Sequence, residues 1–258
     1  MIPYLTQCMG CKQVIDRFFS VLCAICEQSL VKCPPLCASC ASPLCLIQPH
    51  STCLRPWIKR LSCPTSTLDS TSARYLLVGK GYEVLKNWKK RGGLFFDRKV
   101  LVSDPELISQ WMNLSAQAIV PIPQTHDRSW QMGKQFAGTP VQRIARWVSI
   151  RCQIPVVPLL EKKTRIKQAK RQAQMTFQER ISNRENPFQW AQNLTTEKGG
   201  SNDKKDVPQS VLLVDDFMTT GQTLREAAHV LKSSGVRQVH AFCLGARVFR
   251  GRRTRENR

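Results

Sequence analysis

Two acidic residues stand directly before a threonine-rich run in the second half of the chain, within the segment VLLVDDFMTTGQT (Val211–Thr223). The leading apolar residues predict a buried strand. Asp215 and Asp216 follow at its carboxyl end, where open α/β sheets bind ligands. Carboxylates can accept hydrogen bonds from two vicinal hydroxyl groups, as on a ribose. We therefore expect Asp215 and Asp216 to hold the sugar of a ligand.

The threonine-rich run itself has the composition of an anion-binding turn. Gly221 permits a tight turn before a predicted helix, whose N-terminus supplies N–H groups and positive potential. The expected phosphate-binding residues are Thr219, Thr220, Gly221, Gln222 and Thr223. Paired acids also occur in phosphoacceptor and Mg²⁺ sites, but those sites do not need this turn, and the Walker sequence is absent. The segment therefore indicates a sugar phosphate, with each half of the motif binding a different end.

Cysteines mark off an N-terminal module, because all of the 12 cysteines except Cys152 and Cys243 lie between Cys8 and Cys63. The candidate metal ligands form four pairs with two-residue spacing: Cys8, Cys11, Cys23, Cys26, Cys37, Cys40, His50 and Cys53. They are enough for two closed tetrahedral Zn²⁺ sites of structural role, each built from two successive pairs. Cys45 could replace His50. Thioredoxin-like chemistry is disfavoured, because no βαβ pattern surrounds the pairs. We expect the module to have its own core and to unfold alone when metal is removed.

The formal net charge of +21 favours polyanionic partners, although a charge excess can also serve solubility alone. Lysine and arginine gather in Lys162–Arg184 and Arg247–Arg258. These tracts are either solvated surface or contacts to single-stranded DNA, which needs no sequence selectivity. Trp88, beside several lysines, is either a stacking platform for bases or a core residue.

The sequence lacks the patterns of a membrane span and of a signal peptide, which bears on where the protein is located in the cell. No apolar stretch approaches the roughly eighteen residues of a membrane span. The start, MIPYLTQCMG, does not read as a signal peptide. We therefore expect a cytoplasmic protein whose cysteines are reduced.

The remaining chain alternates predicted strands and helices. The strands are Ala73–Val78, Ala118–Pro123, Val156–Leu160, Ser210–Val214 and Val239–Leu244. The helices are Tyr82–Arg91, Gln135–Arg151 and Leu224–Ser234. This order predicts an α/β fold with a parallel sheet and helices on both faces. Ser62–Ser72 is expected to be a linker and Thr195–Asp206 a loop, so the expected domains are 1–61, 73–247 and a basic tail, 248–258.

These motifs resemble the type I phosphoribosyltransferase fold and, within it, the ComF family. Ile119–Pro123 is similar to the Val-Pro-Val-Pro strand of that family, which leads into the loop facing pyrophosphate. Matching positions further on are Gln172, Arg180, Asn183 and Phe188. The cysteine pairs resemble the double zinc ribbon that ComF-type proteins often carry. The resemblance covers the N-terminal module and nearly all of Ala73–Arg247.

One stretch departs from the family pattern. Where ComF proteins usually carry Arg-Gly-Phe-Asn-Gln, this chain has Met132–Phe136, which keeps Gly133 but lacks the usual Arg and Asn. The resemblance implies that Arg128 and Lys134 are the cations that face the phosphates here.

The resemblance implies binding of phosphoribosyl pyrophosphate (PRPP) or ribose 5-phosphate, with Mg²⁺ accompanying PRPP. It leaves two classes of function. The chain is either a ligand-binding protein of DNA uptake in natural transformation, or a transferase. In the first class its partners would be single-stranded DNA and DNA-uptake proteins such as the competence helicase. In the second it would move ribose 5-phosphate from PRPP to a nitrogenous base. The altered Met132–Phe136 stretch favours the first class.

Overall fold

A parallel sheet forms the centre of the molecule. The structure is a computed structural model that describes residues 6–8, 10–15, 22–36, 67–91, 101, 105–124, 138–163, 186–191 and 207–247. Within these ranges four strands pair in the order β3-β8-β7-β4, and every pair is parallel. Their bounds are Ser70–Leu76 for β3, Ala118–Pro121 for β4, Ser210–Met218 for β7 and Gln238–Ala246 for β8.

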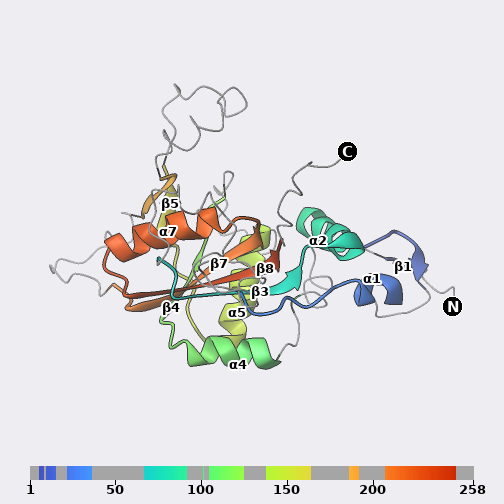
Figure 1. Ribbon diagram of the computed structural model, residues 1–258, viewed down its shortest axis with the longest axis horizontal. Helices are drawn as coiled ribbons and strands as arrows, with labels where there is room; N and C mark the ends of the chain where they lie inside the picture. The colour runs from blue at the N-terminus through green and yellow to red at the C-terminus, as the bar shows by residue number, and fades with distance from the viewer. Residues whose placement is uncertain are drawn as a thin grey trace, which may run out of the picture.

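Helices cover both faces of this sheet. Helix α7 (Gln222–Ser233) packs on one face, where its Leu224 and Leu231 share a buried cluster with Leu213 of β7. On the other face lie α2 (Gly79–Arg91), α4 (Pro105–Asn113) and α5 (Pro140–Cys152). Figure 1 shows α7 on the opposite side of the sheet from α4 and α5. This arrangement confirms the predicted α/β fold with helices on both faces.

The N-terminal cysteine segment joins the core of the α/β fold. It consists of β1 (Thr6–Gln7), β2 (Val14–Ile15) and α1 (Ala24–Gln28), and Figure 1 shows α1 beside α2. Cys8 and Cys26 lie in the same buried cluster as Trp88 of α2, which is a core residue with none of its surface exposed. The expectation that the module has a separate core is therefore wrong for the described residues before position 37.

A small antiparallel pair, β5 (Leu160–Lys162) and β6 (Phe188–Trp190), packs over α7. The side chain of Asn186 fixes this pair. Its Nδ2 donates to the carbonyl oxygen of Glu226 at 2.8 Å, and its Oδ1 accepts from the N–H of Phe188 at 3.0 Å. Phe188 is buried in the cluster on this face.

Two predicted strands have different bounds in the structure: serines extend the first, and a proline interrupts the second. Ser70 and Ser72, expected in a linker, belong to β3, where their hydroxyls are satisfied by His240 Nδ1 at 2.8 Å and the Ala241 carbonyl at 3.4 Å. Val156–Leu160 is not a continuous strand. Val156 makes a single parallel bridge to Ile119, and β5 begins only at Leu160. Pro158 lacks the N–H that a ladder needs.

Helix α5 begins later than predicted. Thr139 caps it with a hydrogen bond from the N–H of Gln142 to Oγ1 at 3.4 Å, and Pro140 occupies the first turn. The return bond runs from the Thr139 N–H to Gln142 Oε1 at 2.8 Å and completes a capping box. Gly138 and Thr139 therefore precede the helix. The expected loop Thr195–Asp206 lies outside the described residues.

None of the helices in the described ranges has the length and apolar character that crossing a membrane requires.

Candidate functional site

The candidate site lies at the carboxyl end of β7. This strand has β8 on one side and β4 on the other. Helix α5, which follows β4 in the chain, packs on one face of the sheet, and α7, which follows β7, packs on the other. Helices that follow two neighbouring parallel strands on opposite faces open a crevice at the carboxyl ends of those strands, and ligands of open α/β sheets bind in such crevices.

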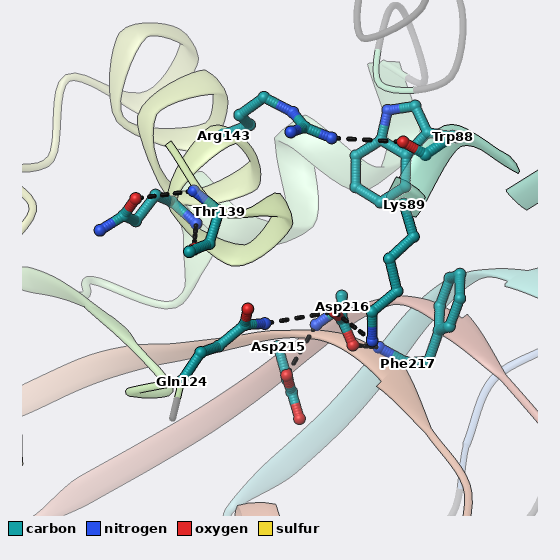
Figure 2. A network of polar contacts seen from close by, with 9 residues as sticks. Trp88, Lys89, Gln124, Thr139, Arg143, Asp215, Asp216 and Phe217 are labelled. Atoms are coloured by element: carbon teal, nitrogen blue, oxygen red, sulfur yellow. Dashed lines mark hydrogen bonds and ion pairs between the residues drawn. The ribbon is translucent and has the colours of Figure 1, made fainter. Parts of the chain in front are cut away.

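Strand β7 runs further than predicted, through both acids to Met218. Side chains alternate between the faces of a strand, so Asp215 and Asp216 point in different directions. Figure 2 shows the carboxylate of Asp216 turned toward Lys89 and that of Asp215 pointing away from it. The two acids therefore have different environments.

Asp216 is buried and surrounded by donors. Its Oδ2 lies 2.7 Å from Lys89 Nζ and accepts from Gln124 Nε2 at 3.3 Å. Its Oδ1 accepts from the N–H of Phe217 at 2.6 Å. The Lys89 ammonium also lies 5.3 Å from the centre of the Phe217 ring, within the range of a cation–π contact. These contacts, drawn in part in Figure 2, hold the Asp216 carboxylate in one orientation.

The carboxyl group of Asp215 has a pKa above the ordinary range of Asp. Burial raises the pKa of Asp215, and the neighbouring charge of Asp216 raises it further, to about 7. The N–H of Asp216, which donates to Asp215 Oδ1 at 2.8 Å, and the charges of Lys89 and Lys162 act in the opposite direction. This carboxyl group can therefore change its charge near neutral pH.

The turn after β7 leads directly into α7. Gly221 is the N-cap residue and has φ 70° and ψ 7°, the left-handed region that favours glycine. Thr220 Oγ1 accepts from the N–H of Gln222 at 3.3 Å, and the Thr220 carbonyl accepts from Arg225 Nη2 at 2.7 Å. Arg225 is buried, so its positive charge lies beneath the turn. The helix N-terminus and this guanidinium both favour an anion at the turn.

Four cysteines come together in the N-terminal segment. The sulfur atoms of Cys8, Cys11, Cys23 and Cys26 all lie within 4.8 Å of one another. Cys11 and Cys23, from different pairs, are 3.7 Å apart at sulfur. Four ligands at ~2.3 Å around a tetrahedral zinc ion would be about 3.8 Å apart, so this cluster has the dimensions of such a site. The pairing of the first two Cys-x-x-Cys motifs is thus as predicted.

The backbone favours the thiolate of Cys8, the form that binds metal, whereas burial and the neighbouring cysteines raise the pKa of Cys26. Burial disfavours the charged form of Cys8. Three backbone N–H groups, from Cys23, Cys11 and Gly10, nevertheless lower the pKa of this thiol to about 6. The N–H of Cys23 lies 3.2 Å from Cys8 Sγ. This arrangement fits a metal-binding role.

The structure describes only some of the predicted site residues. Asp215, Asp216 and the turn Thr219–Thr223 are adjacent, as are the four cysteines of the first cluster. Several predicted residues lie outside the described residues, and their roles stay predictions: Arg128, Lys134, Cys37, Cys40, Cys45, His50 and Cys53.

Three residues around the site were not predicted. Gln124 follows the end of β4, next to β7, so its position after a parallel strand was a usable signal. Arg225 lies one turn after Gly221 on α7, where a buried arginine is unusual. No feature of the sequence predicted a role for Lys89, because it resembles the other lysines of its helix.

Two comparisons with known proteins agree with this geometry. The phosphoribosyl transferase domain family matches residues 159–257, which include β7, the turn and α7. The chain is also 25% identical over 250 residues to competence protein F of Haemophilus influenzae, in an alignment covering 92% of this chain and 96% of that protein. Together with the cysteine cluster, these matches confirm the resemblance to the ComF family and to a phosphoribosyl transferase domain that the motifs indicate.

Proposed function

We propose that the chain binds the ribose 5-phosphate part of PRPP, or ribose 5-phosphate itself, at the end of β7. The observation that carries this proposal is the continuity of the two acids with a turn that has a left-handed Gly221 at the N-terminus of α7. The turn offers an anion site, and the acids offer hydroxyl acceptors. The match to a phosphoribosyl transferase domain supports the same ligand class.

In this proposal the two acids share the ribose hydroxyls. A carboxylate has about four acceptor positions, and Asp216 uses three of them for Lys89, Gln124 and Phe217. One position is left for a hydroxyl group. Asp215 supplies the second acceptor when it is ionised.

The phosphate groups take the other side of the site. Thr219, Thr220, Gly221, Gln222 and Thr223 would hold the 5-phosphate, with Arg225 beneath them. Arg128 and Lys134 are the proposed cations for the pyrophosphate, and Mg²⁺ would accompany PRPP because it neutralises a diphosphate. In the N-terminal segment we propose zinc as the metal, with two ions per chain, of which Cys8, Cys11, Cys23 and Cys26 hold one.

We further propose that the chain serves DNA uptake and contacts single-stranded DNA, with DNA-uptake proteins as partners. The net charge of +21 and the similarity to a competence protein support this role. A chain that acts on DNA should lose affinity steeply as salt rises, because lysine and arginine release counterions from phosphates. Deleting Arg250–Arg258 should lower that salt slope by roughly one for each phosphate that the tail neutralises.

The alternative is an active phosphoribosyltransferase that releases pyrophosphate from PRPP in the presence of a nitrogenous base. The complete Asp215–Thr223 segment favours it, because both halves of the sugar-phosphate motif are retained. The changed Met132–Phe136 stretch opposes it.

Calorimetry on one preparation tests these alternatives. Wild-type protein is titrated with PRPP and Mg²⁺, with ribose 5-phosphate, and with single-stranded DNA at near-physiological salt. Binding of the sugar phosphates that is abolished in Gly221→Val supports the proposed ligand; equal binding by both proteins would place the site elsewhere. Pyrophosphate release from PRPP is assayed separately in the presence of a nitrogenous base. DNA binding without such release supports the uptake role. Pyrophosphate release with a base, and no DNA binding, would establish the transferase.

A further inference from the structure

Helix α2 contacts both the cysteine cluster and the candidate ligand site. On the cluster side, Asn87 Nδ2 donates to the carbonyl oxygen of Gly10 at 2.8 Å. Gly10 lies between the cluster and the helix: a Cβ there would be 2.8 Å from Cys26 Sγ and 2.9 Å from Val84 Cγ2. Only a glycine lets the metal-binding loop approach α2 this closely.

The N-terminal segment is attached at two further places. Gly81 of α2 packs so closely on the Ser29 carbonyl that a side chain there would collide with it. The chain after α1 then pairs with β3, through Cys33 N–H to the Arg74 carbonyl at 2.8 Å and Leu76 N–H to the Val31 carbonyl at 2.9 Å. The cluster is therefore tied to the start of α2 and to the edge of the sheet.

On the ligand side, α2 delivers Lys89. Successive helix residues are rotated by about 100°, so Asn87 and Lys89 point to nearly opposite sides of the helix. Trp88, between them, is completely buried, and Arg143 of α5 lies 5.0 Å from its ring centre and donates from Nη2 to its carbonyl at 3.4 Å. One turn of α2 thus contacts the metal-binding loop, the core and Asp216.

We propose that a metal ion held by the first cysteine cluster positions α2 and, through Lys89, sets the affinity of the phosphoribosyl site. Lys89 is a positioning residue: it orients the Asp216 carboxylate and keeps one acceptor free for a ribose hydroxyl. The part of this inference that concerns affinity rests on the function proposed above.

The physical reason is that the cysteine segment has little structure without metal. Its strands β1 and β2 have two residues each and α1 has five. Elements this short do not persist alone, so metal binding and folding of such a segment are one event. Removal of the metal would release the Gly10 carbonyl from Asn87 and expose the side of α2 that the loop covers.

The first experiment needs no ligand. Hydrogen–deuterium exchange is followed in full-length protein with metal bound and after chelation. Exchange in 79–91 should rise at least about tenfold on chelation, since opening then costs less, while exchange in 222–233 stays unchanged. Unchanged exchange in 79–91, or an equal rise in both helices, would overturn the inference. This outcome is independent of whether the protein binds sugar phosphates.

The second experiment keeps the metal and uses a double-mutant cycle with ribose 5-phosphate as the probe. Asn87→Ala should retain the metal and lower affinity about threefold, and Lys89→Met should lower it about tenfold. Because both act through the Lys89–Asp216 ion pair, the double variant should bind no more weakly than Lys89→Met alone. Lys89→Arg should restore most of the affinity, and Lys90→Met is the control that removes a neighbouring charge without effect.

Additive decreases in affinity in the double variant, or a decrease in Lys90→Met equal to that in Lys89→Met, would overturn the link through Lys89. If wild-type protein does not bind ribose 5-phosphate or PRPP, the proposed function fails, and the exchange measurement still decides whether the metal positions α2.

Discussion

The cysteine cluster and the turn Thr219–Thr223 are both built around short sequence motifs, but different forces hold them. The turn lies between a nine-residue strand and a twelve-residue helix, β7 and α7, whose apolar side chains are buried in the sheet core. The elements around the cluster have only two, two and five residues, and Cys26 lies inside the five-residue helix α1. Burial of these apolar side chains shapes the turn, whereas in the proposal above the cluster depends on a bound metal ion. Helix α2 touches both regions.

The largest effect should follow from breaking the cluster. Cys26→Ser removes a buried ligand that also packs in the core shared with α2, so metal content should fall by one ion per chain. The free energy of unfolding should drop by about 3–5 kcal/mol, as when other proteins are deprived of a structural metal or core group. Cys152→Ser, outside the cluster, is the control. Elemental analysis measures the metal content of both variants, and thermal melting measures their stability. Unchanged metal content in Cys26→Ser would contradict the assignment of Cys26 as a metal ligand.

Breaking the turn should abolish ligand binding without unfolding the chain. Gly221→Val forces a β-branched residue into φ 70°, and its side chain would crowd the anion site. Gly235→Val is the matched control, because Gly235 also has a positive φ (104°) but lies at the other end of α7. Calorimetry with ribose 5-phosphate should detect no binding in the first variant and near wild-type affinity in the second. Abolished binding in both would assign the effect to α7 as a whole.

Removing the charge of Asp216 should have a smaller effect. Asp216→Asn keeps the shape of the side chain but leaves the Lys89 ammonium without its carboxylate partner. Affinity for PRPP should fall by about 1–3 kcal/mol, the usual range for a charged hydrogen-bond partner. An affinity equal to that of wild type would show that Asp216 does not face the ligand.

The smallest effect concerns the titration of Asp215, whose pKa is raised to about 7 by burial and by the charge of Asp216. If the ionised form accepts a ribose hydroxyl, affinity should rise about tenfold between pH 6 and pH 8. Asp215→Asn should abolish that dependence, which separates it from titration of the ligand phosphate. A pH dependence that persists in the variant would exclude Asp215 as its source.

The same titration has a consequence for stability. A carboxyl group with a raised pKa binds its proton more tightly in the folded state, so stability falls as pH rises from the ordinary range of Asp to about 7. Asp215→Asn should therefore be more stable than wild type at pH 8 and similar to it at acidic pH. Thermal melting at both pH values measures this difference.

The sequence alone determined the features that depend on neighbouring residues. The apolar run before Asp215, the turn at Gly221 and the apolar face of α7 are all local, as is the spacing of the Cys-x-x-Cys pairs. The alternation of strands and helices was sufficient for the α/β class. Boundaries were wrong at β3, α5 and the strand predicted at Val156, where hydroxyl satisfaction, a capping box and proline decided.

The tertiary structure decided which distant residues complete the site. Lys89 reaches Asp216 from α2, and Gln124 reaches it from the end of β4. Nothing in the sequence of α2 distinguishes Lys89 from Lys86 or Lys90. The continuation of β7 to Met218, which separates the directions of Asp215 and Asp216, depends on pairing with β8. The shared core of the cysteine segment depends on Gly10 and Gly81, where the absence of a side chain permits contact. Such contacts are set by the packing of elements far apart in the chain, and a local pattern carries no record of that packing.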